Sequence, residues 1–489
     1  METKTLSIKE KALQLNLDNR VYGSVAEIGA GQEVAANFFK AGGASGTVAK
    51  TMSAYDMAFS DAIYGPEESG RYVCEPRVMK MLDKEFKLCV RRLTHRADDT
   101  CFFAFANTVE VLNYARTNQG RGWAGLRFQL SPHSEPNDCV IHFKLRDNDM
   151  LLQQQAVGMV GINLIYACYY LNHNAEDLLN SLVDELMLHR IEIDFFRLTG
   201  PDFEDVDNRL FSLKLVKNGL TRAAMFGPDG SILQPSDVLY KKHILVLRGR
   251  FRPITWVNID MMEAGLRHFK NDPEVDENKI ITISELTLTD LKNTSGGVVD
   301  EKDFLDRVNI LCSLGHNVMV SNYPEYYRLV NYLSRYTRKK KIGLLVGVHN
   351  IEQIFMEKYY KEVPGGILQA LGAMFGENVK LYAYPTYRRT SMQVVKSDGA
   401  KIKPSLKLLY DYFMQNNKIE DLDDCNIGNL HIVSDNVLEM IKSGNDGWEK
   451  YMPEQVAEAI KTNCLFDYPC SVEYQKELEE KKKNPDIAQ

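Results

Sequence analysis

The residues of this chain best suited to chemistry lie in its second half, directly after short apolar runs. They carry guanidinium, carboxylate, amide and imidazole groups: Arg248, Arg250, Arg252, Glu285, Asn322 and His349. If the runs are parallel strands of an open sheet, their carboxyl ends lie along one edge, where such sheets bind ligands. Guanidinium groups suit phosphate or carboxylate, and the pKa of histidine lies near neutral pH. We therefore expect the arginines and the amide to bind an anion, with His349 and Glu285 as catalytic acid–base groups.

The spacing of the three arginines sharpens this expectation. Arg248, Arg250 and Arg252 alternate, so in an extended segment their side chains point to one side. Like charges there repel each other unless an anion or an acidic partner compensates them. The alternative is a set of salt bridges to the other domain or to a second subunit. The alternative to a catalytic role for His349 is a structural role at the end of a strand.

A Gly-rich region in the first half supplies a second set of candidates. At a predicted strand and the turn after it, Glu27, Gly29 and Gly31 fit part of the glycine-rich motif of methyltransferases, with Glu33 in place of the third glycine. Backbone N–H groups at the start of the next helix can bind an anion such as phosphate. The dinucleotide pattern G-x-G-x-x-G fails at Val34. A second turn lacks the Walker spacing but could bind an anion with Gly43, Ser45, Gly46, Thr47 and Lys50. Arg127, near the end of an alternating strand, adds positive charge. Close packing of small residues is the alternative for both turns.

Composition narrows the class of protein. The chain has 489 residues, which favours two or three domains, and its net charge of −7 opposes wholesale binding of nucleic acid. Its nine cysteines are scattered without a CxxC pair, as in a reducing compartment. The most apolar run, 156–171, is shorter than the roughly 20 residues of a membrane span. The first 20 residues are charged throughout. We expect a cytoplasmic protein that binds neither membrane nor metal, because no histidine or cysteine spacing suits a metal site.

Hydrophobic patterning predicts the elements that must position these residues. In the second half, apolar runs at 243–249, 279–286, 317–322, 341–348 and 379–384 alternate with helix-period segments. That order predicts an α/β fold whose C-terminal half is a mainly parallel sheet with helices on both faces. The N-terminal half reads as mixed α/β. We expect an N-terminal domain at 1–236, a C-terminal doubly wound domain at 237–470 and a charged tail at 471–489.

Several stretches resemble a known family. They include AEIGAGQEVA (26–35), RIEIDFFRLTGPDF (190–203), VLYKKHILVLRGRFRP (238–253) and VSNYPEYYRLVNYLSRYT (320–337). They are similar to largely uncharacterised bacterial proteins often labelled nicotinate-nucleotide adenylyltransferase. The label implies a mononucleotide substrate, ATP and a Rossmann-like fold with an HxGH-type motif. No such motif occurs in this chain, so we transfer no catalytic residue.

Together these patterns lead to one expectation and two alternatives. We expect an enzyme or binding protein that holds a small phosphorylated, nucleotide-like or carboxylated ligand between two α/β domains. The first alternative is a non-catalytic homo-oligomeric assembly protein. The second is a transferase that moves an adenylyl or methyl group to or from a nucleotide. A homo-oligomer is expected in each case, and the residues identify no cofactor.

Overall fold

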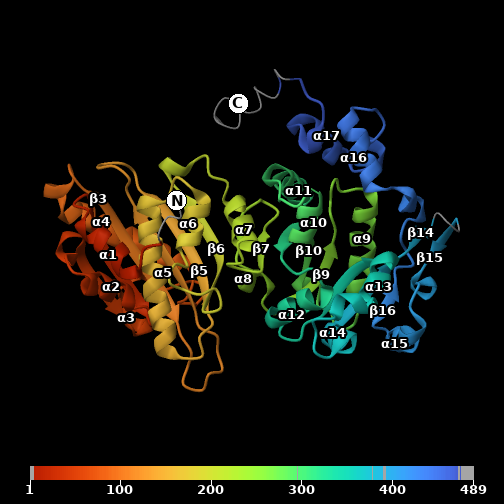
Figure 1. Ribbon diagram of the computed structural model, residues 1–489, viewed down its shortest axis with the longest axis horizontal. Helices are drawn as coiled ribbons and strands as arrows, with labels where there is room; N and C mark the ends of the chain where they lie inside the picture. Colours follow the sequence, from red (N-terminus) through yellow and green to blue (C-terminus); the bar gives the residue numbers. More distant parts are fainter. Residues whose placement is uncertain (1–4, 295, 377, 389–391, 472–473, 475–489) are drawn as a thin grey trace. The chain divides into compact units, whose positions relative to one another are not determined.

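The chain folds into two compact units in a computed structural model that describes residues 5–294, 296–376, 378–388, 392–471 and 474 (Figure 1). Unit 1 is Met1–Ala224 and unit 2 is Met225–Gln489. Each unit contains its own sheet covered by helices, which confirms the predicted α/β class. The division falls about a dozen residues before the boundary expected at 236. The reason is a short hairpin, β7 (Ala223–Phe226) and β8 (Ile232–Leu233), which lies in the sheet of unit 2.

The sheet of unit 1 is mixed, as expected for the N-terminal half. Its strands are β1 (Val21–Gly29), β2 (Val48–Ala54), β3 (Cys101–Glu110), β4 (Arg121–Phe128), β5 (Asn137–Leu145) and β6 (Ile191–Thr199). They lie in the order β2-β1-β3-β4-β5-β6. Strands β2, β1 and β3 are parallel, whereas β3 to β6 pair antiparallel. The parallel part needs crossover connections, and helices supply them.

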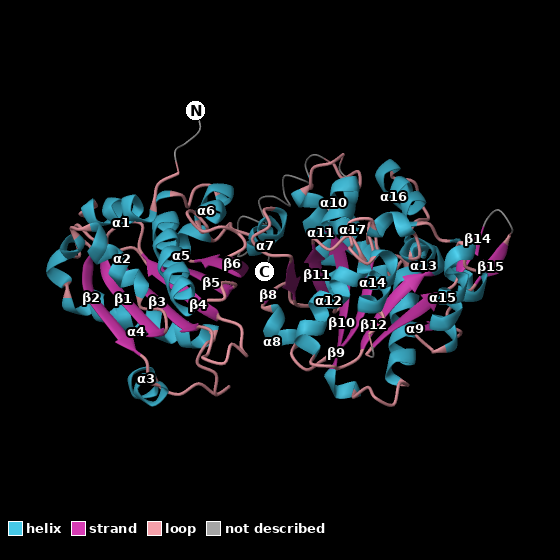
Figure 2. Ribbon diagram, turned by 60° about the horizontal axis from the view of Figure 1, so that its bottom comes forward, coloured by secondary structure: helices cyan, strands magenta, loops and turns pink. Residues whose placement is uncertain are grey.

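Helices cover both faces of this sheet (Figure 2). On one face lie α1 (Ile8–Leu17), α2 (Glu33–Ala41) and α5 (Met150–Tyr170), and on the other lies α4 (Glu75–Arg92). Successive residues of a strand face opposite sides of the sheet. Phe105 of β3 lies against α5, whereas the next residue, Ala106, is paired with Gly125 of β4, which lies against α4. The apolar run at 156–171 is the buried part of α5, as expected. Among the described residues, no helix combines the length and hydrophobicity that a membrane crossing requires.

The sheet of unit 2 carries the predicted parallel strands. They are β9 (His243–Arg248), β10 (Ile280–Thr287), β11 (Asn317–Ser321), β12 (Ile342–Gly347), β13 (Val379–Tyr384) and the short β16 (Ile419–Asp421). The sheet order is β16-β13-β12-β9-β10-β11-β7-β8. Each pair from β16 to β11 is parallel. In chain order these strands read 3-2-1-4-5-6 across the sheet, which is the doubly wound arrangement.

Helices follow the strands of unit 2 on both sides. Helices α9 (Trp256–Lys270) and α11 (Glu301–Ser313) follow β9 and β10, while α12 (Tyr326–Thr337) and α14 (Gly366–Met374) pack against each other. Right-handed crossovers place the two pairs on opposite faces, because the chain moves across the sheet in opposite directions. The remaining helices include α15 (Pro404–Gln415), α16 (Ser434–Ser443) and α17 (Glu454–Asn463). Most of the predicted tail at 471–489 lies outside the described residues.

One cysteine pair departs from the sequence-based expectation. Cys464 and Cys470 form a disulfide just after α17, whereas the scattered spacing favoured a reducing compartment over a disulfide framework. Neither scattered spacing nor the lack of a CxxC pair reveals two cysteines that are six residues apart. Cys74, Cys89, Cys101, Cys139, Cys168 and Cys312 are buried, and Cys425 is half-buried.

Candidate functional site

The strand order of unit 2 defines where a ligand site is expected. The chain moves in one direction from β9 through β10 to β11, and in the other direction from β12 through β13 to β16. The order therefore reverses between β9 and β12, which are neighbours in the sheet about 4.8 Å apart. Helices leave the carboxyl ends of these two strands toward opposite faces, which opens a crevice for ligands in sheets of this kind. Arg248–Arg252 follow β9, and His349 follows β12.

Arg248 and Glu285 form a buried ion pair at this edge. They are direct neighbours on β9 and β10, and the Arg248 Nε and Nη2 atoms lie 2.8 Å and 3.0 Å from the Glu285 carboxylate oxygens. The side chains are 8% and 0% exposed. Burial alone would lower the pKa of Arg248, but the charge and hydrogen bonds of Glu285 outweigh burial and raise it. The pair is a fixed part of the sheet edge.

The end of β11 and the loop after it complete the surroundings of this ion pair. Ser321 Oγ donates to Glu285 at 2.6 Å, and Arg248 Nη2 and Nη1 donate to the carbonyl oxygens of Tyr323 and Pro324. The Arg248 guanidinium also lies over the Tyr326 ring, with 4.4 Å between Cζ and the ring centroid. Asn322, the predicted anion ligand, is half-buried in this loop. Arg248 is therefore occupied by protein groups, in contrast to the free clamp expected from the sequence.

Tyr326 connects the ion pair to the segment that carries His349. Burial raises the pKa of Tyr326 to about 12, although the nearby Arg248 charge and a hydrogen bond with Asn350 lower it. Asn350 and His349 begin α13 (Val348–Ile354), directly after β12. The His349 ring is largely exposed, with Nε2 3.0 Å from the Gln353 amide nitrogen and Nδ1 3.8 Å from the Glu352 carboxylate. The carboxylate beside this imidazole is therefore that of Glu352, while Glu285 faces Arg248.

Arg250 and Arg252 lie in the loop between β9 and α9, and their side chains diverge. Phe251 has a φ of +46°, so the segment is not extended and the arginines do not share one side. Arg252 Nε lies 2.5 Å from Asp303, which also pairs with the fully buried Arg307. The half-exposed Arg250 pairs with the exposed Asp435 at 2.9 Å. The expected convergent three-arginine clamp is absent from this described loop, and Arg250 is its most exposed guanidinium.

Sequence reasoning missed several groups of this edge. Tyr326, Ser321, Asp303 and Arg307 all contact the predicted residues or their partners. The signal that could have found Ser321 and Tyr326 is position, because Ser321 lies at the end of a predicted strand and Tyr326 begins the helix that follows. Asp303 and Arg307 lie one helical turn apart on α11, at an i,i+4 spacing that favours ion pairs. No local sequence pattern predicts that Asp303 pairs with Arg252, which is 51 residues away.

In unit 1, the two Gly-rich turns lie at opposite edges of the sheet. Gly29 ends β1 and Gly31 follows it, whereas Gly43 and Gly46 precede the amino end of β2. The parallel pairing of β1 with β2 requires this separation, because α2 must run back along the sheet between them. Nine residues of β1 correspond to about 30 Å. The two turns therefore cannot contribute to one phosphate pocket.

A buried carboxylate already occupies the start of α2. Glu27 Oε1 accepts a hydrogen bond from Val34 N at 3.1 Å, and Oε2 accepts one from Ala35 N at 3.2 Å. Asn107 Nδ2 donates to the same carboxylate at 3.2 Å. Burial raises the pKa of Glu27 to about 7, although these hydrogen bonds lower it. The backbone N–H groups expected to bind a phosphate here are satisfied by the chain itself.

Packing accounts for the glycines of both turns. A Cβ on Gly31 would lie 2.2 Å from Asn107 Oδ1, and Gly29, with φ +75°, lies against the Val109 carbonyl. In the second turn, Gly43 has a φ of +75°, and a Cβ on Gly46 would lie 2.9 Å from the Asn16 carbonyl oxygen. These contacts need no ligand.

The polar candidates of unit 1 have protein partners or lie on the surface. Ser45 is exposed, and Thr47 is buried and donates to the Leu15 carbonyl. Lys50 belongs to β2 and pairs with the buried Glu85 of α4. Arg127 makes a bidentate pair with Asp138, both hydrogen bonds being 2.8 Å long, and also contacts Asp83.

Metal binding has no geometric support in the described part of the chain. Within residues 5–294, 296–376, 378–388, 392–471 and 474, no group of three or more His, Cys, Asp or Glu side chains is placed to hold an ion. The exposed groups at the carboxyl edge of unit 2 include the Arg250 guanidinium and the His349 imidazole.

Comparisons with known proteins show limited similarity. No protein-family model matches the chain, and no curated protein matches it. Among solved structures, the competence/damage inducible protein CihA from Agrobacterium tumefaciens matches at 17% identity, over 34% of this chain and 98% of its own, with a TM-score of 0.24. A competence-damaged protein (CinA) superfamily protein from Enterobacter cloacae matches at 12% identity, over 34% and 95%, with a TM-score of 0.25. Neither likeness supports an argument about the function of this chain, and no family model supports the adenylyltransferase label.

Proposed function

We propose that unit 2 binds a small anionic, nucleotide-like ligand at the carboxyl edge of its parallel sheet, beside the ends of β9 and β12. The observation that carries this proposal is the reversal of strand order between these neighbouring strands. The proposal concerns unit 2 alone. The nucleotide, phosphate or carboxylate class of the ligand follows from the groups available there, a guanidinium and an imidazole.

Each residue at this edge has a distinct proposed role. Arg250 contacts the anion, because its guanidinium is half-exposed. Its present partner, Asp435, is also exposed, so replacing that ion pair by the ligand costs little free energy. His349 faces solvent from the neighbouring strand end and donates or accepts a proton. Arg248 and Glu285 hold the edge in place without contacting the ligand. Asn322 offers an amide beside them.

A binding titration with a matched arginine control tests this proposal. We expect at least one of ATP, NAD⁺ or a sugar phosphate to bind the full chain, and Arg250→Ala to weaken binding about tenfold or more, because a charge-assisted hydrogen bond is lost. The control is Arg267→Ala. Arg267 lies in the last turn of α9, is as exposed as Arg250 and also forms an ion pair, with Asp424. The control affinity should equal that of the wild type. Equal losses in the two variants, or no binding of any probe, would contradict the proposal.

Exposed apolar side chains of unit 1 favour a second candidate function, assembly of several copies of the chain. The group follows the carboxyl ends of β2, β3 and β5 and comprises Tyr55, Met57, Phe59, Tyr114, Met150, Leu151 and Leu152. Contiguous apolar patches on protein surfaces mark interaction sites, and we infer that these side chains together form such a site.

Sedimentation of point variants tests the assembly function. If this surface joins copies, Phe59→Ser will lower the sedimenting mass toward that of a monomer. Leu408→Ser, which changes an even more exposed leucine on α15 of unit 2, will leave the mass unchanged. A wild type that sediments as a monomer at all concentrations would exclude this function.

A further inference from the structure

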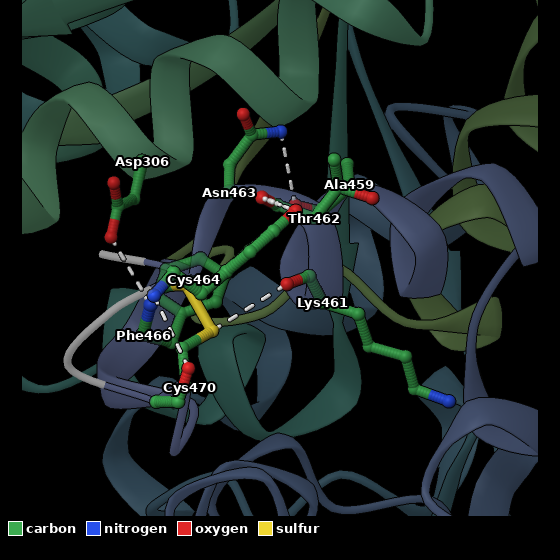
Figure 3. Close-up of a disulfide and its surroundings, with 10 residues drawn as sticks. Asp306, Ala459, Lys461, Thr462, Asn463, Cys464, Phe466 and Cys470 are labelled. Atoms are coloured by element: carbon green, nitrogen blue, oxygen red, sulfur yellow. Dashed lines mark hydrogen bonds between the residues drawn. A yellow bond between two sulfur atoms is a disulfide. The ribbon is translucent and has the colours of Figure 1, made fainter. Parts of the chain in front are cut away.

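The disulfide of unit 2 closes a short loop at the end of the described chain. We call residues 464–470, with the sequence CLFDYPC, the C-terminal loop. Its end residues, Cys464 and Cys470, are bonded directly after α17 (Figure 3). Leu465 and Phe466, directly after Cys464, are 5% and 2% exposed, so the loop inserts apolar side chains into unit 2.

The backbone of the C-terminal loop adopts conformations that side chains disfavour. Cys464, Phe466 and Asp467 have φ values of +51°, +54° and +61°, in the left-handed region that glycine usually occupies. Such residues persist only where the surrounding structure holds them. The closed ring of the disulfide is one such constraint, since it removes the extended conformations of the open loop.

The second constraint is a buried hydrogen bond to α11. Phe466 N donates to Asp306 Oδ2 at 3.1 Å, and Figure 3 shows the carboxylate reaching toward the loop. Asp306 lies on the same helix as Asp303 and Arg307, which hold the loop after β9 through Arg252 and the Arg250 carbonyl. The C-terminal loop is therefore packed on the helix that supports the β9–α9 loop.

The two cysteines of the disulfide differ in their exposure to solvent. Cys464 is 6% exposed, whereas Cys470 is half-buried, and its Sγ lies 3.6 Å from the Lys461 carbonyl oxygen. A thiolate from solvent can thus approach Cys470 more easily than Cys464. Thiol–disulfide exchange requires this access.

We propose that Cys464 and Cys470 form a thiol–disulfide switch that fastens the C-terminal loop to α11. A dithiol reductant attacks Cys470 Sγ with one thiolate, which breaks the protein disulfide and releases Cys464 as a thiolate. The second thiol of the reductant then displaces Cys470, so that the reductant becomes a disulfide and both protein sulfurs end as thiols. Glutathione disulfide reverses the process and leaves as two glutathione molecules. In the cytoplasm, the compartment we propose for this protein, such a bond is transient and responds to the redox state.

Reduction acts on the loop because the ring closure is lost. The open segment regains the conformations that the disulfide excluded, and the left-handed residues relax. The hydrogen bond between Phe466 and Asp306 then opens more often, and Leu465 and Phe466 are exposed for a larger fraction of time. The switch concerns the protein alone, so its test needs no ligand.

Hydrogen exchange and thiol counting on the full chain test the switch. After equilibration with glutathione disulfide, we expect two fewer cysteines to be alkylated in the denatured protein than after treatment with dithiothreitol. Amides of 464–470 should then exchange roughly tenfold faster in the reduced protein than in the oxidised one. Cys470→Ser should exchange rapidly at 464–470 under both conditions.

Cys425→Ser is the matched control, because it removes a half-buried cysteine of the same unit that lies outside the disulfide. It should respond to the two reagents as the wild type does. If Cys470→Ser fails to fold, the reduced wild type still gives the readout without any substitution. Equal exchange at 464–470 in oxidised and reduced wild type would overturn the switch, and so would full alkylation of all nine cysteines after oxidation.

Discussion

Replacing Glu285 with alanine will destabilise unit 2 by about 3–5 kcal/mol, because the Arg248 guanidinium is left buried without its counter-charge. Ser321 Oγ loses its acceptor in the same variant. Some carbonyl contacts of Arg248 remain, but they carry no net charge. Chemical denaturation followed by fluorescence measures the free energy of unfolding, and the transition of unit 2 should move to lower denaturant.

Asp435→Ala is the matched control for this prediction. It also removes a carboxylate from an arginine, but both Arg250 and Asp435 are about half-exposed, so water replaces the lost partner. We expect a loss of less than about 1 kcal/mol. The double variant Arg248→Met with Glu285→Leu should recover much of the loss, since apolar groups of similar size often replace a buried ion pair well. Similar effects of Glu285→Ala and Asp435→Ala would contradict the assigned role of the buried pair.

Unit 1 will lose stability as the pH rises from about 4.5 to about 7, and Glu27 is the cause. Burial raises the pKa of this carboxyl to about 7 in the folded protein, from 4.5 as its ordinary value. Between these values the folded state binds more protons than the unfolded state, so the free energy of unfolding falls with rising pH. A shift of this size corresponds to about 3 kcal/mol in total. Below pH 4.5 both states are protonated, and this contribution no longer changes.

Glu27→Gln removes the titrating group and keeps an oxygen for the N–H groups at the start of α2. Its free energy of unfolding should vary with pH by about 3 kcal/mol less than that of the wild type over this range. Glu176→Gln changes an exposed glutamate in the first turn of α6 (Ala175–Ser181) and should keep the wild-type profile. Denaturant titrations at pH 5 and pH 8 measure the difference. Parallel pH profiles of the wild type and Glu27→Gln would show that the carboxyl is not perturbed.

The strands and helices of unit 2 could be predicted from the sequence because their signals are local. The apolar run at 243–249 became β9, which α9 follows, and the run at 379–384 became β13. By contrast, β16 has three residues and a single apolar side chain, which is too weak a pattern to detect. Strand β2 was missed for a similar reason, since it lies at an edge and alternates with exposed positions. The sequence therefore places Lys50 in a turn, although it belongs to β2.

The partners of the charged residues could not be predicted, because they come from distant parts of the chain. Arg250 and Asp435 are 185 residues apart, and Arg252 and Asp303 are 51 apart. The sequence showed three alternating arginines and no indication that Phe251 turns the backbone between them. The capping of α2 by Glu27 was missed although the two are close in sequence. A glutamate before a Gly-rich turn fits a ligand-binding motif. Glu27 instead accepts the hydrogen bonds of the N–H groups that would bind the ligand.

Hydrogen exchange with a bound probe tests whether a ligand binds at the carboxyl edge of the parallel sheet of unit 2. The probe is the tightest binder among ATP, NAD⁺ and sugar phosphates in the titration. We predict that it slows exchange at 249–255 and at 347–350, the segments after β9 and β12. Unit 2 also has a polar pocket of about 400 Å³ at the opposite, amino edge, lined by His268, Lys341 and Lys380 among others. Protection confined to that pocket or to unit 1 would contradict the claim.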